Sequence, residues 1–220
     1  MMKGKDCLIA LLLTGLFVFV SCDPPPPEYS AGEDGTAYSK EEIAPEMLSR
    51  PADTIDISKL KNQLEESLKD TAIAKYYKSV YRQGKIITGD DRLMLTVTEK
   101  LFTAEPDRAY FFFLVFTRSM NGADGFYSEA LGLAAMDFLR ENTGTFASYF
   151  DGAPGLTALD MKNWAHCIYG ELQISEEGNE EQAIYELEKE LMQNIKGSGK
   201  EGVITRFMAG IRAERIDLTD

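Results

Sequence analysis

Hydrophobic residues recur at intervals of three and four positions through most of the chain beyond residue 55. The spacing is clearest in two stretches: Trp164, Ala165, Ile168 and Leu172, and then Ile184, Leu187, Leu191 and Ile195. Intervals of three and four place side chains on one face of an α-helix, whereas strict alternation indicates a β-strand. The pattern therefore predicts an all-α protein.

Residues that start and stop helices separate these segments. Thr157 and Asp160 have the spacing of a capping box, with Asp in place of the more usual Glu. Gly84 and Gly197 each follow a hydrophobic stripe, where a helix commonly ends. The connections are short and the segments number about seven or eight. We therefore expect a single helical domain over residues 51–220.

In three segments the hydrophobic spacing alone does not define the type of element or its buried face. Residues 91–104 fit an alternating strand pattern as well as a helix, and the helix is favoured because two aspartates start the segment. Residues 109–116 are apolar on every side, which predicts a central element surrounded by others. A buried strand is the alternative, and Pro106 and Asp107 at the start and Gly122 at the end favour a helix. The next segment, DGFYSEALGLAAMDFLREN at residues 124–142, is expected to be a helix with Asp124 as its cap. Its expected inward residues are Phe126, Ala130, Leu133, Ala134 and Phe138.

The stretch SEALGLAAMDFLREN, residues 128–142, has small residues inside and a charged end. Its texture resembles a HEAT-type helical repeat, although no second copy aligns with it. We therefore expect either a layered helical bundle or a HEAT-like α-solenoid.

The N-terminus has the pattern of an export signal. Lys3 and Lys5 precede an apolar run from Leu8 to Val20, which ends before the small residue Ser21. A helix that crosses a bilayer needs about 20 apolar residues, so this run is too short. A positive head, a short apolar core and a small residue are typical of a secretory signal peptide, here residues 1–21.

The residues FVSC at positions 19–22 resemble the lipobox of bacterial lipoproteins, in a relaxed form similar to that of Bacteroidetes because Phe19 stands where Leu is commonest. The resemblance covers residues 1–22 only. It implies cleavage before Cys22, a diacylglyceryl group on its sulfur and attachment to a membrane of the bacterial cell envelope through acyl chains. Ordinary secretion, with Cys22 as a plain thiol, is the alternative.

A stalk is expected between this anchor and the helical domain. Pro24 to Pro27 favour an extended polyproline II segment, and the polar residues that follow have little to bury. We assign residues 22–50 to the lipidated cysteine and a flexible stalk. Asp23 and Glu28 weakly resemble the export tag of surface lipoproteins, so the periplasmic face and the cell surface both stay open.

The composition is strongly acidic. The 220 residues contain 23 Lys and Arg against 36 Asp and Glu, a net charge of −13. This balance argues against a nucleic-acid partner and favours either a basic protein partner or solubility alone. Of the three cysteines, Cys7 and Cys22 belong to the N-terminal signal, so Cys167 has no partner for an intramolecular disulfide.

No catalytic, cofactor or metal motif is evident. His166 is the only histidine, which excludes a zinc motif with two histidines. Its neighbour Cys167 cannot pair with it, because consecutive residues on a helix do not face each other. We expect His166 at the surface or at a rim, on the side of the helix that carries Leu159, Asn163 and Gly170. Cys167 is expected to be partly buried, with a thiol pKa that Asp160 and Glu171 raise.

The residues from Glu171 to Glu190 include eight glutamates and a single lysine, Lys189. They lack the regular spacing with which aspartates surround calcium in an EF-hand. A solvated helix face is the simplest interpretation. The candidate binding face for a basic partner consists of Glu176, Glu177, Glu180 and Glu181.

The leading hypothesis is a membrane-anchored lipoprotein whose helical domain binds another macromolecule without catalysis. One version is an inhibitor or immunity protein that neutralises a basic toxin or hydrolase. The alternative is an envelope hydrolase that uses a carboxylate pair in a helical cleft. A passive structural lipoprotein is a third hypothesis.

Overall fold

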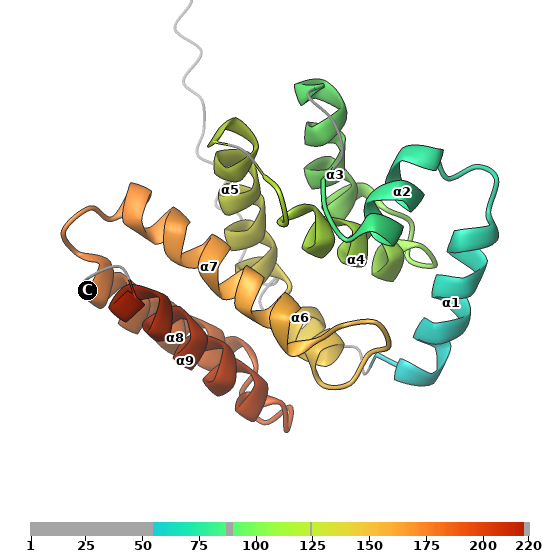
Figure 1. Ribbon diagram of the computed structural model, residues 1–220. Helices are drawn as coiled ribbons and strands as arrows, with labels where there is room; N and C mark the ends of the chain where they lie inside the picture. Colours follow the sequence, from blue (N-terminus) through green and yellow to red (C-terminus); the bar gives the residue numbers. More distant parts are fainter. Residues whose placement is uncertain (1–54, 87–89, 124, 218–220) are drawn as a thin grey trace, which may run out of the picture. The chain divides into compact units, whose positions relative to one another are not determined.

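The computed structural model describes residues 55–86, 90–123 and 125–217, and all the regular structure within these ranges is helical (Figure 1). The all-α prediction is therefore confirmed. The helices are α1 (Ile57–Lys69), α2 (Lys75–Gln83), α3 (Asp91–Thr103), α4 (Ala109–Ser119), α5 (Gly125–Glu141), α6 (Thr143–Phe150), α7 (Ala158–Ser175), α8 (Glu180–Asn194) and α9 (Glu201–Asp217). The expected signal peptide, the stalk with Cys22 and the expected cap Asp124 lie outside the described residues.

The described ranges contain nine helices, more than the seven or eight expected. The hydrophobic stripe of residues 57–83 runs almost unbroken, but the chain forms two helices there. Asp70 ends α1: its backbone N–H donates to the Glu66 carbonyl at 2.8 Å, and its Oδ1 accepts from the Ala72 N–H at 2.8 Å. Arg108 pairs with Asp70 at 2.7 Å. These contacts stabilise the break between α1 and α2.

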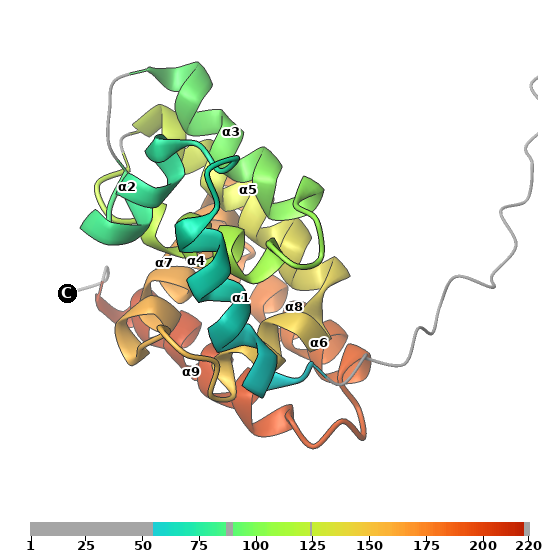
Figure 2. The same ribbon diagram turned by 90° about the vertical axis from the view of Figure 1, so that its right-hand side faces the viewer.

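Helix α4 lies at the centre of the fold, as its apolar composition predicts. Helices α1, α2, α3 and α7 all pack against it, and Figure 2 shows α1 in front of it. Every side chain from Tyr110 to Thr117 is buried. The ring of Phe113 stacks on Trp164 of α7, with centroids 5.3 Å apart. Aromatic pairs of this kind add about 0.5–1.5 kcal/mol beyond the area that they bury.

The C-terminal helices form a second packing region around α7. Helix α7 packs mainly on α9 and α5, and α8 lies beside α9 (Figure 1). The backbones of α7 and α9 approach closely at Gly210, where a Cβ atom would lie 3.2 Å from Cβ of Ala165. Small residues at this crossing allow the close contact between the two helices.

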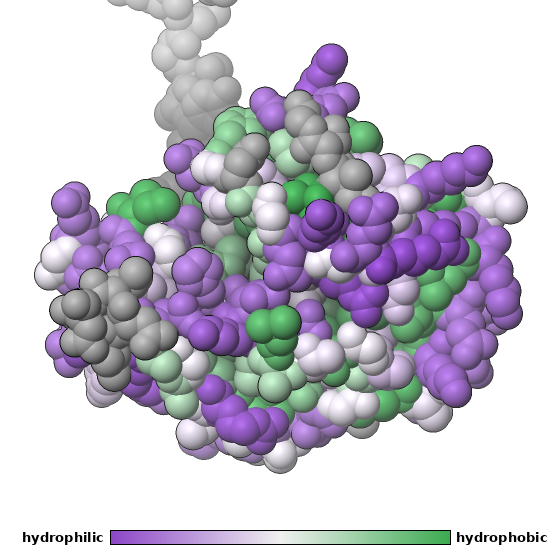
Figure 3. Space-filling view, viewed as in Figure 1, coloured by the Kyte–Doolittle hydropathy of each residue, from purple (hydrophilic) through white to green (hydrophobic). Residues whose placement is uncertain are grey.

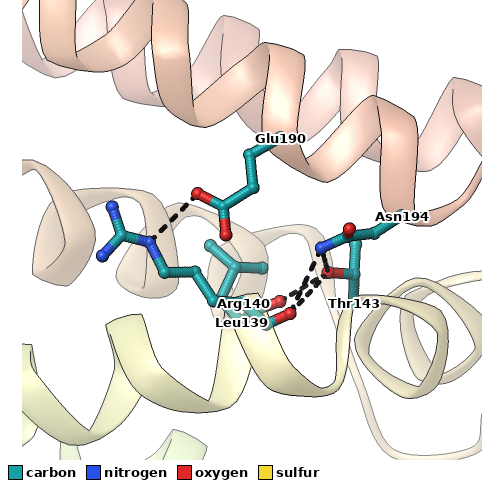
Figure 4. A network of polar contacts seen from close by, with 5 residues as sticks. All are labelled: Leu139, Arg140, Thr143, Glu190 and Asn194. Atoms are coloured by element: carbon teal, nitrogen blue, oxygen red, sulfur yellow. Dashed lines mark hydrogen bonds and ion pairs between the residues drawn. The ribbon is translucent and has the colours of Figure 1, made fainter. Parts of the chain in front are cut away.

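A polar network attaches α8 to the junction of α5 and α6 (Figure 4). Asn194 donates to the Arg140 carbonyl at 3.3 Å and to Oγ1 of Thr143 at 3.2 Å. Oγ1 of Thr143 donates to the Leu139 carbonyl at 2.8 Å, and Arg140 forms an ion pair with Glu190 at 3.3 Å. The network fixes the start of α6 against the last turn of α8.

The buried face of α5 differs from the expected one. Phe126 and Leu133 are 53% and 59% exposed, whereas Tyr127 and Leu131 of the same helix are buried. The prediction for Phe126 and Leu133 is therefore wrong, and Ala130 is only half-buried. The expected burial of Ala134 and Phe138 is confirmed. Helix α5 carries apolar residues on two adjoining sides, and its packing on α3 and α7 selects one of them.

The surface carries exposed apolar residues at several positions, and Figure 3 shows hydrophobic residues as separate patches on a largely hydrophilic face. Among the described residues, none of the helices combines the length and the apolar character that crossing a membrane requires.

Candidate functional site

A groove of about 300 Å³ lies between α5 and α7. Helix α5 contributes Glu129 and Gly132, and helix α7 contributes His166, Cys167 and Glu171. Most of the lining surface is apolar, with a few polar groups among it. A concave apolar site with a small number of polar groups is the usual character of a binding site.

Gly132 and Gly170 both line this groove, and they have different surroundings. A Cβ atom at Gly170 would meet nothing within 4 Å, so the α7 wall is open at this position. At Gly132 the space is already taken: a Cβ there would lie 2.7 Å from Oε2 of Glu171 and 3.3 Å from its Cβ. The side chain of Glu171 therefore lies directly against the backbone of α5.

Glu171 is the unusual residue of the groove. It is only 9% exposed, and within the described residues its carboxylate has neither a hydrogen bond nor an ion pair. Burial raises its pKa, and the negative charge of Asp137 on α5 raises that pKa further. Buried carboxylates are normally paired or hydrogen-bonded, because removing an ion from water without compensation is unfavourable.

His166 lies at the edge of the groove, with its side chain 71% exposed, so the expected rim position is confirmed. Asn163 and Gly170, expected on the same side of the helix, also line the groove. The Nδ1 atom of His166 is 2.8 Å from Oε2 of Glu214, a buried residue of α9. Lys162 approaches the other oxygen of Glu214 at 3.8 Å. Lys162 and His166 therefore both contact Glu214 of α9.

Cys167 is half-buried in the groove wall. Burial raises the pKa of its thiol to about 12, with a further contribution from Glu171. The expected effect of Glu171 is therefore confirmed. Burial and Glu171 are the causes of this shift, and Asp160 is not one of them. The carboxylate of Asp160 instead accepts hydrogen bonds from the Thr157 N–H and Oγ1, which confirms the predicted capping box. A thiol that stays protonated at neutral pH is a poor nucleophile.

The candidate acidic face lies at the end of α7 and the start of α8. Glu176 and Glu177 are exposed, and neither forms an ion pair within the part of the chain that the structure describes. Glu180 accepts a hydrogen bond from the Gly178 N–H at 3.0 Å, and Glu181 pairs with Arg215 at 3.0 Å. Only two of the four glutamates are therefore available to a partner without the loss of an existing contact.

The three glutamates of the acidic stretch that lie further along α8 also form ion pairs. Glu186 pairs with Lys189 at 3.5 Å, Glu190 with Arg140 at 3.3 Å, and Glu188 with Arg212. The density of glutamates in the sequence therefore overstates the free negative charge on α8.

The groove was not predicted from the sequence. Its one available signal was the presence of Gly132 and Gly170 inside helical patterns, where an isolated glycine often marks a special packing site. Among the described residues, no three His, Cys, Asp or Glu side chains are grouped so that they would hold a metal ion. No protein-family model matches the chain, and neither a curated protein nor a solved structure matches it.

Proposed function

We propose that the protein is a lipoprotein of the bacterial cell envelope whose helical domain binds another protein without catalysis. The observation that carries this proposal is the groove between α5 and α7, which combines an apolar lining with the carboxylate of Glu171, a residue only 9% exposed and unpaired within the described ranges. The raised thiol pKa of Cys167 and the engagement of His166 by Glu214 leave a site suited to binding. The anchor rests on the resemblance of FVSC to a lipobox.

A basic partner fits this region best. Glu129 and Glu171 line the groove, and the exposed Glu176 and Glu177 follow directly after α7. The whole chain has a net charge of −13, which would favour the approach of a basic protein. An inhibitor or immunity protein that neutralises a basic toxin or hydrolase is the version that this charge supports.

Site-specific crosslinking in the native cell tests the proposal. A photoreactive residue at Ile174, which lines the groove and is 68% exposed, should capture one partner in high yield. The matched control is the same residue at Leu159, which is 61% exposed at the start of α7 and does not line the groove. Capture at neither position, or equal capture at both, would contradict binding at the groove.

Charge reversal then tests the acidic turn after α7. The double variant Glu176→Lys and Glu177→Lys should weaken capture, because it removes two negative charges without breaking an ion pair of the described residues. Glu181 is left intact because it pairs with Arg215. The control reverses Glu65 and Glu66, two exposed residues of α1. Equal capture by the two double variants would remove the turn from the interface.

An envelope hydrolase remains the second candidate, and one observation favours it. Glu129 and Glu171 line the same groove from α5 and α7, and burial raises the pKa of Glu171 as it does for a general acid. Under this hypothesis the protein cleaves a glycan or peptide substrate, and Glu171→Gln lowers its rate by about 100-fold or more. A screen of envelope glycans and peptides without any turnover would remove this candidate.

A further inference from the structure

We propose that the groove between α5 and α7 receives the side chain of a lysine on the partner protein, whose ammonium group pairs with Glu171. This inference rests on the proposed function, because it names the chemical group by which the partner is recognised. Its basis is Glu171, a residue that is only 9% exposed, lines the groove and has no counter-ion for its carboxylate among the described residues.

No basic side chain of the described residues forms an ion pair with Glu171. The basic side chains nearest to it along α7 are Lys162 and His166, and both contact Glu214 of α9. The neighbouring charge that acts on Glu171 is Asp137, which has the same sign. A cation from outside the chain would therefore relieve an unfavourable charge that the fold leaves uncompensated.

The lining of the groove suits an unbranched alkyl chain with a charged end. Leu131 and Ile174 provide apolar surface, while Gly170 adds no side chain that would narrow the space. A lysine has four methylene groups and a compact ammonium with three donors. Its stem can lie on the apolar lining while the ammonium donates to Glu171, and Glu129 supplies a second carboxylate on the facing helix.

A metal ion is a poorer fit to the same carboxylates. Calcium takes about six to eight oxygen ligands, and magnesium requires a nearly octahedral set. The groove contributes only the carboxylates of Glu129 and Glu171 within the described residues. Charge and shape together therefore favour an organic cation.

Titration of the purified full chain with a small probe tests the inference. The probe is Nα-acetyl-lysine methylamide, and the matched ligand is its Nε-acetylated form, which keeps the alkyl chain and loses the charge. The amide NMR signals of Gly132 and Gly170 report on the groove. The lysine probe should shift both signals in a saturable manner, and the acetylated form should not. Equal shifts with both ligands, or none with either, would overturn the inference.

Two variants then test the charge of the Glu171 carboxylate and its position against α5. Glu171→Gln removes the carboxylate and should weaken binding of the probe by about ten-fold or more, because a charged hydrogen bond is lost. Gly132→Ala keeps the charge but places a methyl group 2.7 Å from the position of Oε2, so it should displace the carboxylate and also weaken binding. Glu65→Gln, at an exposed position of α1, is the matched control and should bind as the unmodified chain does.

The two proposals can fail separately. Saturable binding of the probe at the groove, without capture of a partner at Ile174, would support the lysine site and contradict the proposed function. A captured partner whose binding is unchanged by Glu171→Gln would support the proposed function and overturn the lysine site. Partner binding that is lost with Glu171→Gln and kept with Glu65→Gln supports both.

Discussion

The hydroxyl of Tyr76 on α2 is buried without a hydrogen-bond partner in the described part of the chain. The carboxylate of Glu171 also lacks a partner there, although this residue, 9% exposed, lines the groove between α5 and α7. Each unsatisfied group lowers the stability of the fold, since in the unfolded chain water would hydrogen-bond to it. The groove gives Glu171 access to a ligand, so its unfavourable burial has a functional explanation.

Glu171→Gln should change the dependence of stability on pH. The folded-state pKa of Glu171 is raised above the ordinary value of 4.5, so the folded chain binds this proton more tightly than the unfolded chain does. The contribution of Glu171 to the free energy of unfolding is therefore most favourable below pH 4.5. This contribution is lost as the pH rises through the folded-state pKa. Relative to the unmodified chain, the variant should gain stability over that interval.

Denaturant unfolding at a series of pH values from acid to neutral measures this difference. The neighbouring acids Asp137 and Glu129 stay in place in both proteins, so the comparison isolates Glu171. A stability difference that stays constant over the whole series would contradict the raised pKa.

Tyr76→Phe should leave stability unchanged or raise it by about 1 kcal/mol, because it removes a buried hydroxyl that has no partner among the described residues. The ring contact with Tyr77, at 5.5 Å between centroids, is kept. Tyr110→Phe is the matched control, since its hydroxyl donates to the Pro154 carbonyl at 2.5 Å and its loss should destabilise the fold by about 1 kcal/mol. Thermal unfolding of the two variants checks this, and equal effects would refute it.

At the scale of elements, α7 connects the core to the groove. Its inner face carries Trp164, which stacks on Phe113 of α4 and donates to Oγ1 of Thr117 at 2.9 Å. Another side of the same helix carries His166 and Glu171 along the groove. The position of α7 against α4, α5 and α9 therefore determines the width of the groove.

The crossing of α7 and α9 depends on a small residue at position 210. Gly210→Leu should destabilise the fold by about 1–3 kcal/mol, because a Cβ at this position already lies 3.2 Å from Ala165 and larger atoms would force the helices apart. Gly202→Leu on the same helix is the control, since its Cβ would meet only the end of Arg206, at 3.9 Å. Chemical denaturation compares the two, and a control variant as unstable as Gly210→Leu would contradict this explanation.

At the scale of the whole molecule, the lipobox resemblance predicts the attachment of the domain. Two or three acyl chains on Cys22 anchor a protein stably, at about 0.8 kcal/mol per buried methylene group. Cys22→Ala should therefore release the protein from membranes, as fractionation of cells would detect. Cys167→Ala, which removes a cysteine of the groove wall, should leave the attachment unchanged. Membrane association that persists in Cys22→Ala would refute the lipobox interpretation.

The sequence alone determined the helical class and several helix ends, because these depend on residues close together in the chain. The capping box of Thr157 and Asp160 and the left-handed Gly84 after α2 were both predicted and are confirmed. The burial of α4 was equally predictable, since a helix that is apolar on every side has no face for water. The rim position of His166 followed from its place on the helical wheel.

Tertiary structure alone decided which face of α5 is buried and where the groove lies. The two apolar sets on α5, one with Phe126 and one with Tyr127, differ by a single position, and only packing against α3 and α7 separates them. The groove depends on the contact between Gly132 of α5 and Glu171 of α7. The ion pair between Glu181 of α8 and Arg215 of α9 likewise joins two different helices. Such contacts depend on how helices distant in sequence pack together, which local periodicity does not encode.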